Sequence, residues 1–172
     1  MIISRTPYRI SLCGGGSDYP EWFKVHGGRV LSTTINKYCY LSVRWLPPFF
    51  EHKHRIVWSQ IENVSKVDDI HHNSVRECMK YLDIYRGISL HHDGDLPARS
   101  GMGSSSAFTV GLLNALYHLN GCETDNHDLA YEAINVEQNW IKDKVGNQDQ
   151  VACAVGGFNE ITFDKSGYFG IN

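Results

Sequence analysis

Apolar residues along this chain follow two periods: the alternation typical of strands and the three-to-four-residue spacing typical of helices. The alternating segments are rich in Val, Ile, Thr and Tyr and end near glycine or proline turns, as strands do. Strands are expected over residues 2–12, 29–45 (as one or two strands), 55–59, 87–92 and 158–163.

Segments with helical spacing lie between these strands. Helices are expected over residues 19–25, with Ser17 and Asp18 as candidate N-caps, over 74–85 and 104–119, and from Thr124 or Asp125 onward. The helix at 104–119 is apolar on nearly every side, which indicates that it is buried. The last helix has one apolar stripe, formed by Leu129, Ala133, Val136 and Trp140. Because strands and helices mix without a strict βαβ alternation, the expected fold class is α+β.

Composition narrows the class of protein. The chain has 172 residues, 42% of them hydrophobic, and a formal net charge of −3, which suits one globular domain. Lys and Arg are scattered, so neither nucleic acid nor an anionic membrane is expected as a partner. No apolar run approaches the roughly 20 residues of a membrane span. Since there is also no apolar signal segment at the N-terminus, a cytoplasmic location is expected.

Cysteine and histidine give little sign of a metal centre. The five cysteines are widely spaced without a C-x-x-C pair, which favours reduced thiols over disulfides or structural zinc. Histidines pair at 52/54, 71/72 and 91/92, but adjacent strand residues point to opposite faces of a sheet. A histidine-bound metal is therefore not expected.

The most informative segment is the loop Pro97–Ala107, between an expected strand and the buried helix. Gly101 and Gly103 let the backbone approach an anion, and the helix N-terminus points its free N–H groups at the same place. Helix capping alone would need only one serine. The candidate phosphate-binding residues are Pro97, Ser100, Gly101, Met102, Gly103, Ser104, Ser105 and Ser106. No lysine follows the second glycine, so this is not a Walker loop.

The run Gly101-Met102-Gly103-Ser104-Ser105-Ser106-Ala107, with Pro97 before it, resembles the central motif of the GHMP kinases. That family includes galactokinase, homoserine kinase and mevalonate kinase, and phosphorylates small metabolites with ATP and Mg²⁺. The resemblance implies an N-terminal GHMP domain, a ribosomal-protein-S5-like α+β layer with helices packed on a mixed sheet. The family's third glycine-rich motif would lie beyond residue 172, so the C-terminal GHMP domain is expected to be absent from this chain.

An N-terminal segment, Thr6–Tyr19, resembles the sugar-binding motif of the same family. The resemblance implies that Arg9 approaches the transferred phosphate and that Asp18 holds substrate hydroxyls. Galactokinases have Glu-His where this chain has Gly15-Gly16, whereas the heptose-phosphate kinase branch has a similar glycine run. The resemblance therefore implies that Gly15, Gly16, Ser17 and Asp18 bind a sugar phosphate, with D-glycero-D-manno-heptose 7-phosphate as the expected acceptor.

Two carboxylates complete the resemblance. It implies that Glu137 and Ser105 ligate Mg²⁺ and that Asp149 orients or deprotonates the acceptor hydroxyl. Without the loop, the plainer interpretation would be one solvated helix carboxylate and one capping aspartate.

The expected activity is in-line transfer of the γ-phosphoryl group of ATP to a sugar hydroxyl. Two alternatives remain open. One is another GHMP kinase, acting on galactose, fucose or mevalonate. The other is a non-catalytic nucleotide or sugar sensor on the same fold. The oligomeric state, and whether this chain is active alone, also stay open.

Overall fold

The computed structural model describes residues 1–98 and 100–172, so Arg99, inside the predicted phosphate loop, lies outside the described residues. A long strand, β2 (Gly28–Trp45), is the centre of the sheet. Along one side it pairs antiparallel with β1 (Ile2–Cys13). Along the other side its first part pairs with β6 (Phe158–Phe163) and its last part with β5 (Ile88–Gly94).

Short strands complete the sheet at both ends. The order is β4-β3-β5-β2-β6-β7, with β1 beside β2. The added strands are β3 (His54–Val57), β4 (Ile61–Val64) and β7 (Phe169–Ile171). Because β3 pairs parallel with β5 while the other pairings are antiparallel, the sheet is mixed.

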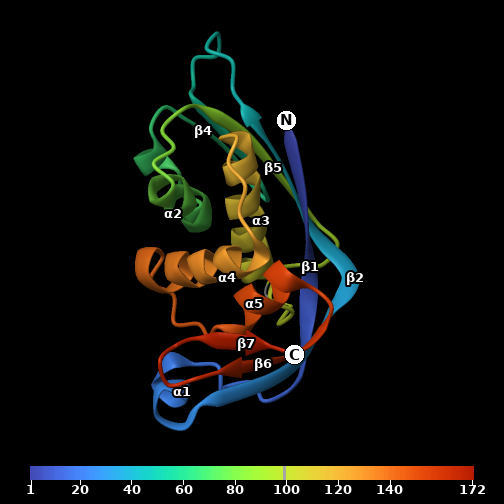
Figure 1. The fold of residues 1–172 in the computed structure, drawn as a ribbon. Coiled ribbons are helices and arrows are strands. Elements are labelled where there is room, and N and C mark those ends of the chain that lie inside the picture. The colour runs from blue at the N-terminus through green and yellow to red at the C-terminus, as the bar shows by residue number, and fades with distance from the viewer. Residues whose placement is uncertain (99) are drawn as a thin grey trace.

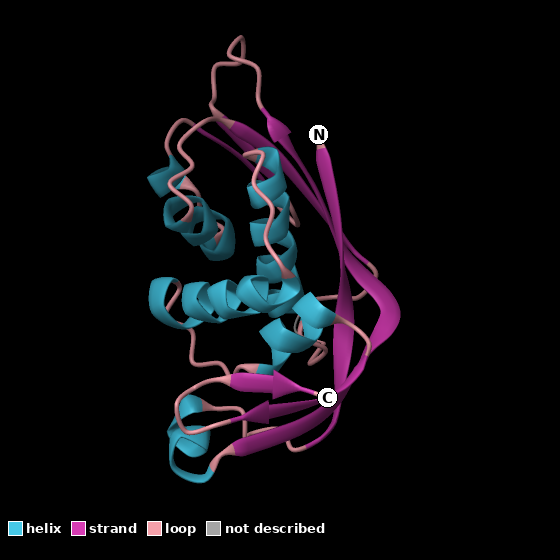
Figure 2. Cartoon of the chain, in the orientation of Figure 1, coloured by secondary structure: helices cyan, strands magenta, loops and turns pink. Residues whose placement is uncertain are grey.

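The helices lie on one side of the sheet, and the other side has no helix over it in Figures 1 and 2. Alternation along the strands separates the two faces: Leu41 and Val43 are buried beneath the helices, while Ser42 and Arg44 point outward. The helices are α1 (Pro20–His26), α2 (Asn73–Tyr81), α3 (Ser104–Leu119), α4 (Asn126–Asn135) and α5 (Gln148–Val155).

The main core surrounds α3. Residues 106–113 of this helix are all buried, and α3 contacts both β1 and β2 as well as α2, α4 and α5. A second apolar cluster lies at the lower end of Figure 1, where Phe23 of α1 stacks on Phe163 of β6 with ring centroids 5.6 Å apart. The predicted α+β class, with helices packed on a mixed sheet, is thus confirmed.

Several expected elements match closely, and three were missed. The buried helix occupies residues 104–119 as predicted, and β6 has its predicted bounds. The strand β4, the helix α5 and the strand β7 were not predicted. Each has only three to eight residues and gains its order from pairing or packing rather than from a strong local pattern.

Two helix predictions need correction. The helix expected to reach residue 85 ends at Tyr81, because Asp83 takes a left-handed φ of 54°. Trp140, predicted on the apolar stripe of the last helix, is 41% exposed and packs edge-on against Tyr81. The cause is a π-helical turn over Val136–Trp140, which widens the helix and moves later residues off the stripe.

In the described part of the chain, no helix combines the length and apolar character that crossing a bilayer requires.

Candidate active site

The helix α3 begins at the predicted phosphate loop, and no side chain among the described residues caps its N-terminus. Its N-cap residue is Gly103, whose φ of 71° lies in the left-handed region that favours glycine. Gly101 has a similar φ of 75°. Because the first N–H groups of a helix have no intrahelical partner and form its positive end, this corner can receive an anion.

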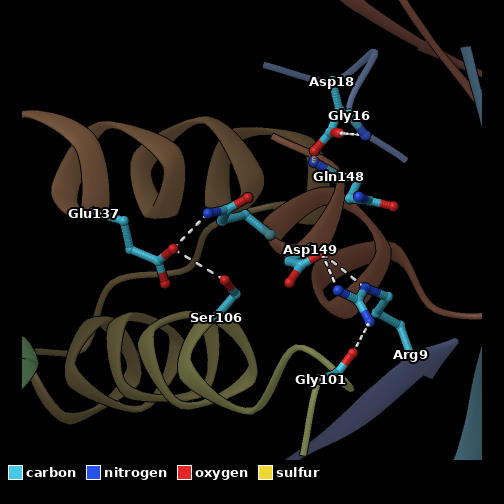
Figure 3. A network of polar contacts seen from close by, with 9 residues as sticks. Arg9, Gly16, Asp18, Gly101, Ser106, Glu137, Gln148 and Asp149 are labelled. Carbon is cyan, nitrogen blue, oxygen red and sulfur yellow. Dashed lines mark hydrogen bonds and ion pairs between the residues drawn. The ribbon is translucent and has the colours of Figure 1, made fainter. Parts of the chain in front are cut away.

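Arg9, next to a bulge in β1, connects the loop to α5. Its backbone N–H donates to the Met102 carbonyl oxygen (3.2 Å), and its Nη1 donates to the Gly101 carbonyl oxygen (2.9 Å). Its Nε donates to Oδ1 of Asp149 at 2.7 Å, and its Nη2 lies 2.5 Å from the same oxygen. Figure 3 shows the guanidinium between the loop and Asp149. One buried cation therefore fixes the two parts of the site relative to each other.

Asp149 lies in the first turn of α5, with 26% of its side chain exposed. Its second oxygen faces the loop, since a Cβ built on Gly103 would lie 3.4 Å from Oδ2. Burial raises the pKa of Asp149, and the Arg9 guanidinium offsets part of that rise. A carboxylate of this kind can accept a proton from a hydroxyl held beside the loop.

Glu137 lies in the π-helical turn and is only 1% exposed. One of its oxygens, Oε2, accepts hydrogen bonds from Ser106 Oγ (2.9 Å) and from Gln150 Nε2, as Figure 3 shows for Ser106. The other oxygen, Oε1, is buried without a hydrogen-bond partner among the described residues, since the nearby Thr109 hydroxyl donates to the Ser105 carbonyl oxygen instead (3.2 Å). Burial raises the pKa of Glu137. An unpartnered buried carboxylate oxygen is costly unless a cation or donor meets it.

These residues fit a magnesium ion held jointly with a nucleotide. Within residues 1–98 and 100–172, no group of three or more His, Cys, Asp or Glu side chains could form a metal cage. Mg²⁺ usually takes one or two protein carboxylates and completes its shell with phosphates and water. Glu137 Oε1, near the serines at the start of α3, offers this partial ligand set.

The three serines of the loop differ in position. Ser106 is buried against Glu137, whereas Ser105 is exposed and Ser104 half-buried. The predicted pairing of Ser105 with Glu137 thus has no direct counterpart in the hydrogen bonds, and the contact of Ser106 was missed. Because α3 is apolar on nearly every side, its periodicity gives no signal for which serine faces Glu137. Ser105 as a metal ligand stays a prediction.

Asp18 is more enclosed than the predicted sugar contact suggests. It is 1% exposed; Oδ1 accepts the N–H of Gly16 (2.9 Å) and Oδ2 accepts the N–H of Gln148 (3.1 Å). A Cβ on Gly146 would clash with the same carboxylate. Asp18 therefore holds the start of α5 against the glycine run, and does not cap α1, whose N-cap is Tyr19. Direct contact of Asp18 with a sugar stays a prediction.

The remaining predicted residues surround this core. Ser17 Oγ donates to the carbonyl oxygens of Gly14 and Arg29, and it also accepts the Arg29 N–H. Gly15, Gly16 and Pro97 are exposed. Ser100 Oγ is buried without a partner in the described part of the chain, so it is a free polar group beside the loop.

A cavity of about 270 Å³ opens beside Ser104 and Ser105 and was not predicted from the sequence. Its other lining residues are Tyr8, Trp58, His72, Ser74, His92, Leu96, Ala98 and Phe108. His72 stacks on Phe108 with centroids 4.6 Å apart, and burial lowers the pKa of both His72 and His92. The lining comes from several elements far apart in sequence, which is why no single motif marked it.

A buried carboxylate supports one wall of this cavity. Glu62 accepts hydrogen bonds from Trp58 Nε1 (2.9 Å), from the His71 N–H (2.5 Å) and from the His72 N–H (3.1 Å). These bonds fix Trp58 and His72 as a rigid aromatic corner. The cavity can therefore receive a flat, mostly apolar group next to the N-terminus of α3.

A family model described as the N-terminal domain of GHMP kinases matches residues 72–157, which is half of the chain. The chain belongs to the GHMP kinase family. The matched range includes the loop, Glu137 and Asp149, while Arg9 and Asp18 lie outside it. The resemblance inferred from the motifs is confirmed.

The curated relatives of this chain carry the names of kinases of sugars or sugar phosphates. The D-glycero-alpha-D-manno-heptose 7-phosphate kinase of Campylobacter jejuni subsp. jejuni is 27% identical over 94% of the chain and 50% of its own length. The galactokinase of Chloroflexus aurantiacus is 26% identical over 90% of the chain and 40% of its own length. The chain thus spans about half the length of the curated relatives it matches.

Solved structures share the fold of the GHMP kinase domain. The crystal structure of a D-glycero-D-manno-heptose 1-phosphate kinase from Bacteriodes thetaiotaomicron matches with a TM-score of 0.89 and 23% identity. That match covers all of the chain and 59% of the solved protein. The galactokinase of Lactococcus lactis, solved with galactose, matches with a TM-score of 0.74 and 20% identity, over 98% of the chain and 46% of the solved protein.

Proposed function

We propose that this chain is the ATP-binding N-terminal half of a GHMP sugar kinase, with the C-terminal GHMP domain outside it. The reaction is phosphoryl transfer from ATP to a hydroxyl of a sugar phosphate. The observation that carries the proposal is the convergence of the α3 N-terminus, Glu137 and the Arg9–Asp149 pair in one corner. Because ATP is the co-substrate, we expect the protein to work in the cytoplasm.

The nucleotide is held at the start of α3. The free N–H groups of the loop and of residues 104–106 bind its β- and γ-phosphates. Its base enters the aromatic cavity next to Ser104 and Ser105 and packs against the corner that Trp58 and His72 form. The lowered pKa values keep His72 and His92 neutral near pH 7, so these rings present no repelling charge.

Glu137 and Ser105 would hold Mg²⁺. When bound, the ion offsets the negative charge of the phosphates and so favours transfer. Ser106 and Gln150 support this role by fixing the Glu137 carboxylate from the opposite side, which leaves Oε1 free for the cation.

Asp149 orients the acceptor hydroxyl and accepts its proton. Its rise in pKa makes it a better base than a fully solvated aspartate, and its Oδ2 is free of hydrogen bonds to described residues. Arg9 holds Asp149 in place and adds positive charge where the phosphoryl group moves.

A sugar phosphate is the favoured acceptor, and a heptose 7-phosphate is favoured among them. A Cβ on Gly16 would meet nothing within 4 Å, and one on Gly15 would come no closer than 3.7 Å to Gln148 Nε2. These glycines therefore leave open space beside the site, where a large acceptor fits. The name of the Campylobacter relative supports the same choice, whereas the galactokinase relatives favour galactose.

Titration of this chain with ATP and Mg²⁺ tests the nucleotide proposal. A ligand that binds only the folded state at a hundredfold excess over Kd stabilises it by about 2.7 kcal/mol, which raises Tm by roughly 5 °C or more. AMP is the matched control, because it lacks the phosphates that the loop holds, and it should bind more weakly. No calorimetric heat and no rise in Tm at millimolar ATP would contradict the proposal.

A competition assay on the complete protein tests the acceptor. We expect a higher kcat/KM for D-glycero-D-manno-heptose 7-phosphate than for galactose. A kcat/KM for galactose equal to or above that for the heptose would contradict the acceptor assignment while leaving the kinase assignment intact.

A further inference from the structure

The outer face of the sheet, opposite the helices, has a pocket of its own. It has a volume of about 260 Å³ and lies where β2, β3 and β5 meet the segment that follows β2. Its lining residues are Met1, Ser42, Arg44, Leu46, Phe50, Arg55, Ser89 and His91. The predicted phosphate loop leads into α3, which lies on the other side of the sheet (Figure 1), and the two pockets share no lining residue among those described, so this pocket is separate from the proposed kinase site.

Strand register explains the shape of the pocket. Ser89 of β5 pairs with Arg44 of β2 on one side and with Arg55 of β3 on the other, so two arginines flank one serine. Two residues along the strands, and so on the same face of the sheet, Ser42 pairs with His91. Small serines therefore form the floor, and long side chains form the walls. Two strand spacings separate the arginine backbones by about 10 Å, which lets both guanidinium groups reach a single ligand between them.

The two arginines also lack partners. Neither Arg44 nor Arg55 has an ion pair, a side-chain hydrogen bond or a stacked ring within the part of the chain that the structure describes. Every other described arginine has one: Arg5 lies over Tyr38, Arg86 over Trp45, Arg9 pairs with Asp149, Arg29 with Glu160 and Arg76 with Glu77. The unpartnered pair lines one pocket, where the two charges repel each other until an anion neutralises them.

We propose that this pocket binds the phosphate group of a small organic phosphate monoester. Two guanidinium forks match the charge and the several oxygens of a phosphate dianion better than those of a single carboxylate. The Ser42 and Ser89 hydroxyls donate to the same oxygens from the floor. Leu46 and Phe50 line the pocket beside the arginines and contact the organic part of the ligand.

Titration of the ¹⁵N-labelled chain with phenyl phosphate, followed by two-dimensional NMR, tests the proposal. We expect saturable shifts of the amides of residues 42–44, 55 and 89–91. Arg44→Gln and Arg55→Gln should each raise the Kd derived from these shifts about tenfold, the scale for losing hydrogen bonds to a charged group. Benzyl alcohol, which lacks the phosphate, should leave these amides unchanged.

Arg5→Gln is the matched control, because the Arg5 guanidinium lies over the Tyr38 ring and Arg5 does not line the pocket. It should keep the wild-type Kd. Shifts confined to residues 100–106 would mean that phenyl phosphate binds only at the loop, and would overturn the proposal. Equal Kd values for wild type, Arg44→Gln and Arg55→Gln would overturn it as well. None of these outcomes depends on kinase activity.

Discussion

Arg9 at the phosphate loop and the pair Arg44 and Arg55 on the outer face carry the same charge in opposite surroundings. Arg9 is 8% exposed and bound to Asp149 and to the loop carbonyl of Gly101. The outer arginines are bound to nothing in the described chain. A cation neutralised within the fold holds other groups in place, whereas an unpaired one keeps its binding capacity for a ligand. Arginine can therefore act in two ways: it can position other residues of a site, or it can stay available to bind a ligand directly.

The largest expected effect comes from Asp149→Asn in the complete protein. The substitution keeps the shape of the side chain and removes the proposed proton acceptor, so kcat should fall by roughly 10²-fold or more. Affinity for ATP should change little, because the proposed site holds the nucleotide through the loop and Glu137. Steady-state kinetics, together with the dissociation constant of ATP, measure both quantities.

Asp143→Asn is the control for this experiment, since Asp143 is an exposed aspartate in the segment before α5. It should leave kcat unchanged. If Asp149 only caps the start of α5, asparagine caps nearly as well and kcat stays near wild type. A stable, ATP-binding Asp149→Asn protein with wild-type kcat would remove Asp149 from the catalytic assignment.

The next effect separates the two kinds of arginine by stability. Arg9→Gln leaves the partly buried Asp149 without its cation, so it should lower the free energy of unfolding by about 2 kcal/mol or more. Arg44→Gln removes no described contact and should change it by less than about 0.5 kcal/mol. Urea unfolding of the two variants measures both. Equal losses of unfolding free energy in the two variants would contradict the distinction between Arg9, which positions other residues, and Arg44, which has no partner in the described chain.

The sequence was most informative where local pattern and motif coincide. Gly101 and Gly103 directly precede an apolar helix that has its predicted bounds, 104–119, and both glycines have a positive φ. The prediction that Arg9 and Asp149 belong to the same site followed from the family resemblance, not from their spacing in the sequence. Residues 140 positions apart have no local signal that brings them together.

Other features depend on packing that no sequence period records. A π-helical turn positions Glu137 and exposes Trp140. The spacing of apolar residues there is the same as in an ordinary α-helix, so the sequence does not indicate the turn. The burial of Asp18 depends on Gly146, which permits close approach from across the chain. The outer pocket results from the register between β2, β5 and β3, so its two arginines appear in the sequence as scattered surface charges.

A smaller effect distinguishes two neighbouring serines. Ser106→Ala removes a hydrogen bond to the buried Glu137 and should cost about 1 kcal/mol of stability. Ser105→Ala removes an exposed hydroxyl and should leave Tm unchanged. If Ser105 ligates the metal, however, its loss should lower kcat more than the loss of Ser106. Equal kcat values at saturating Mg²⁺ would contradict Ser105 as the metal ligand.

The smallest expected effect is a pH dependence set by Glu137. Burial raises its pKa in the folded protein above that in the unfolded chain. As pH rises from about 4.3, the ordinary pKa of glutamate, the unfolded chain therefore releases its proton first. Folding stability should fall over this range and level off above the folded-state pKa. Glu137→Gln has no proton to release, so its Tm should lack this part of the fall.

The difference between the Tm profiles of wild type and Glu137→Gln isolates this residue, because Asp149, whose pKa burial also raises, titrates in both proteins. Glu123→Gln, at an exposed position, is the matched control and should follow the wild-type profile. If Mg²⁺ bound with ATP contacts the unpartnered Oε1, adding both ligands should raise the Tm of the wild type at high pH. The rise should be smaller for Glu137→Gln, because its amide is a weaker ligand for the cation. Superimposable profiles of wild type and Glu137→Gln would show that Glu137 stays ionised without cost, and would remove the electrostatic reason for a cation at this carboxylate.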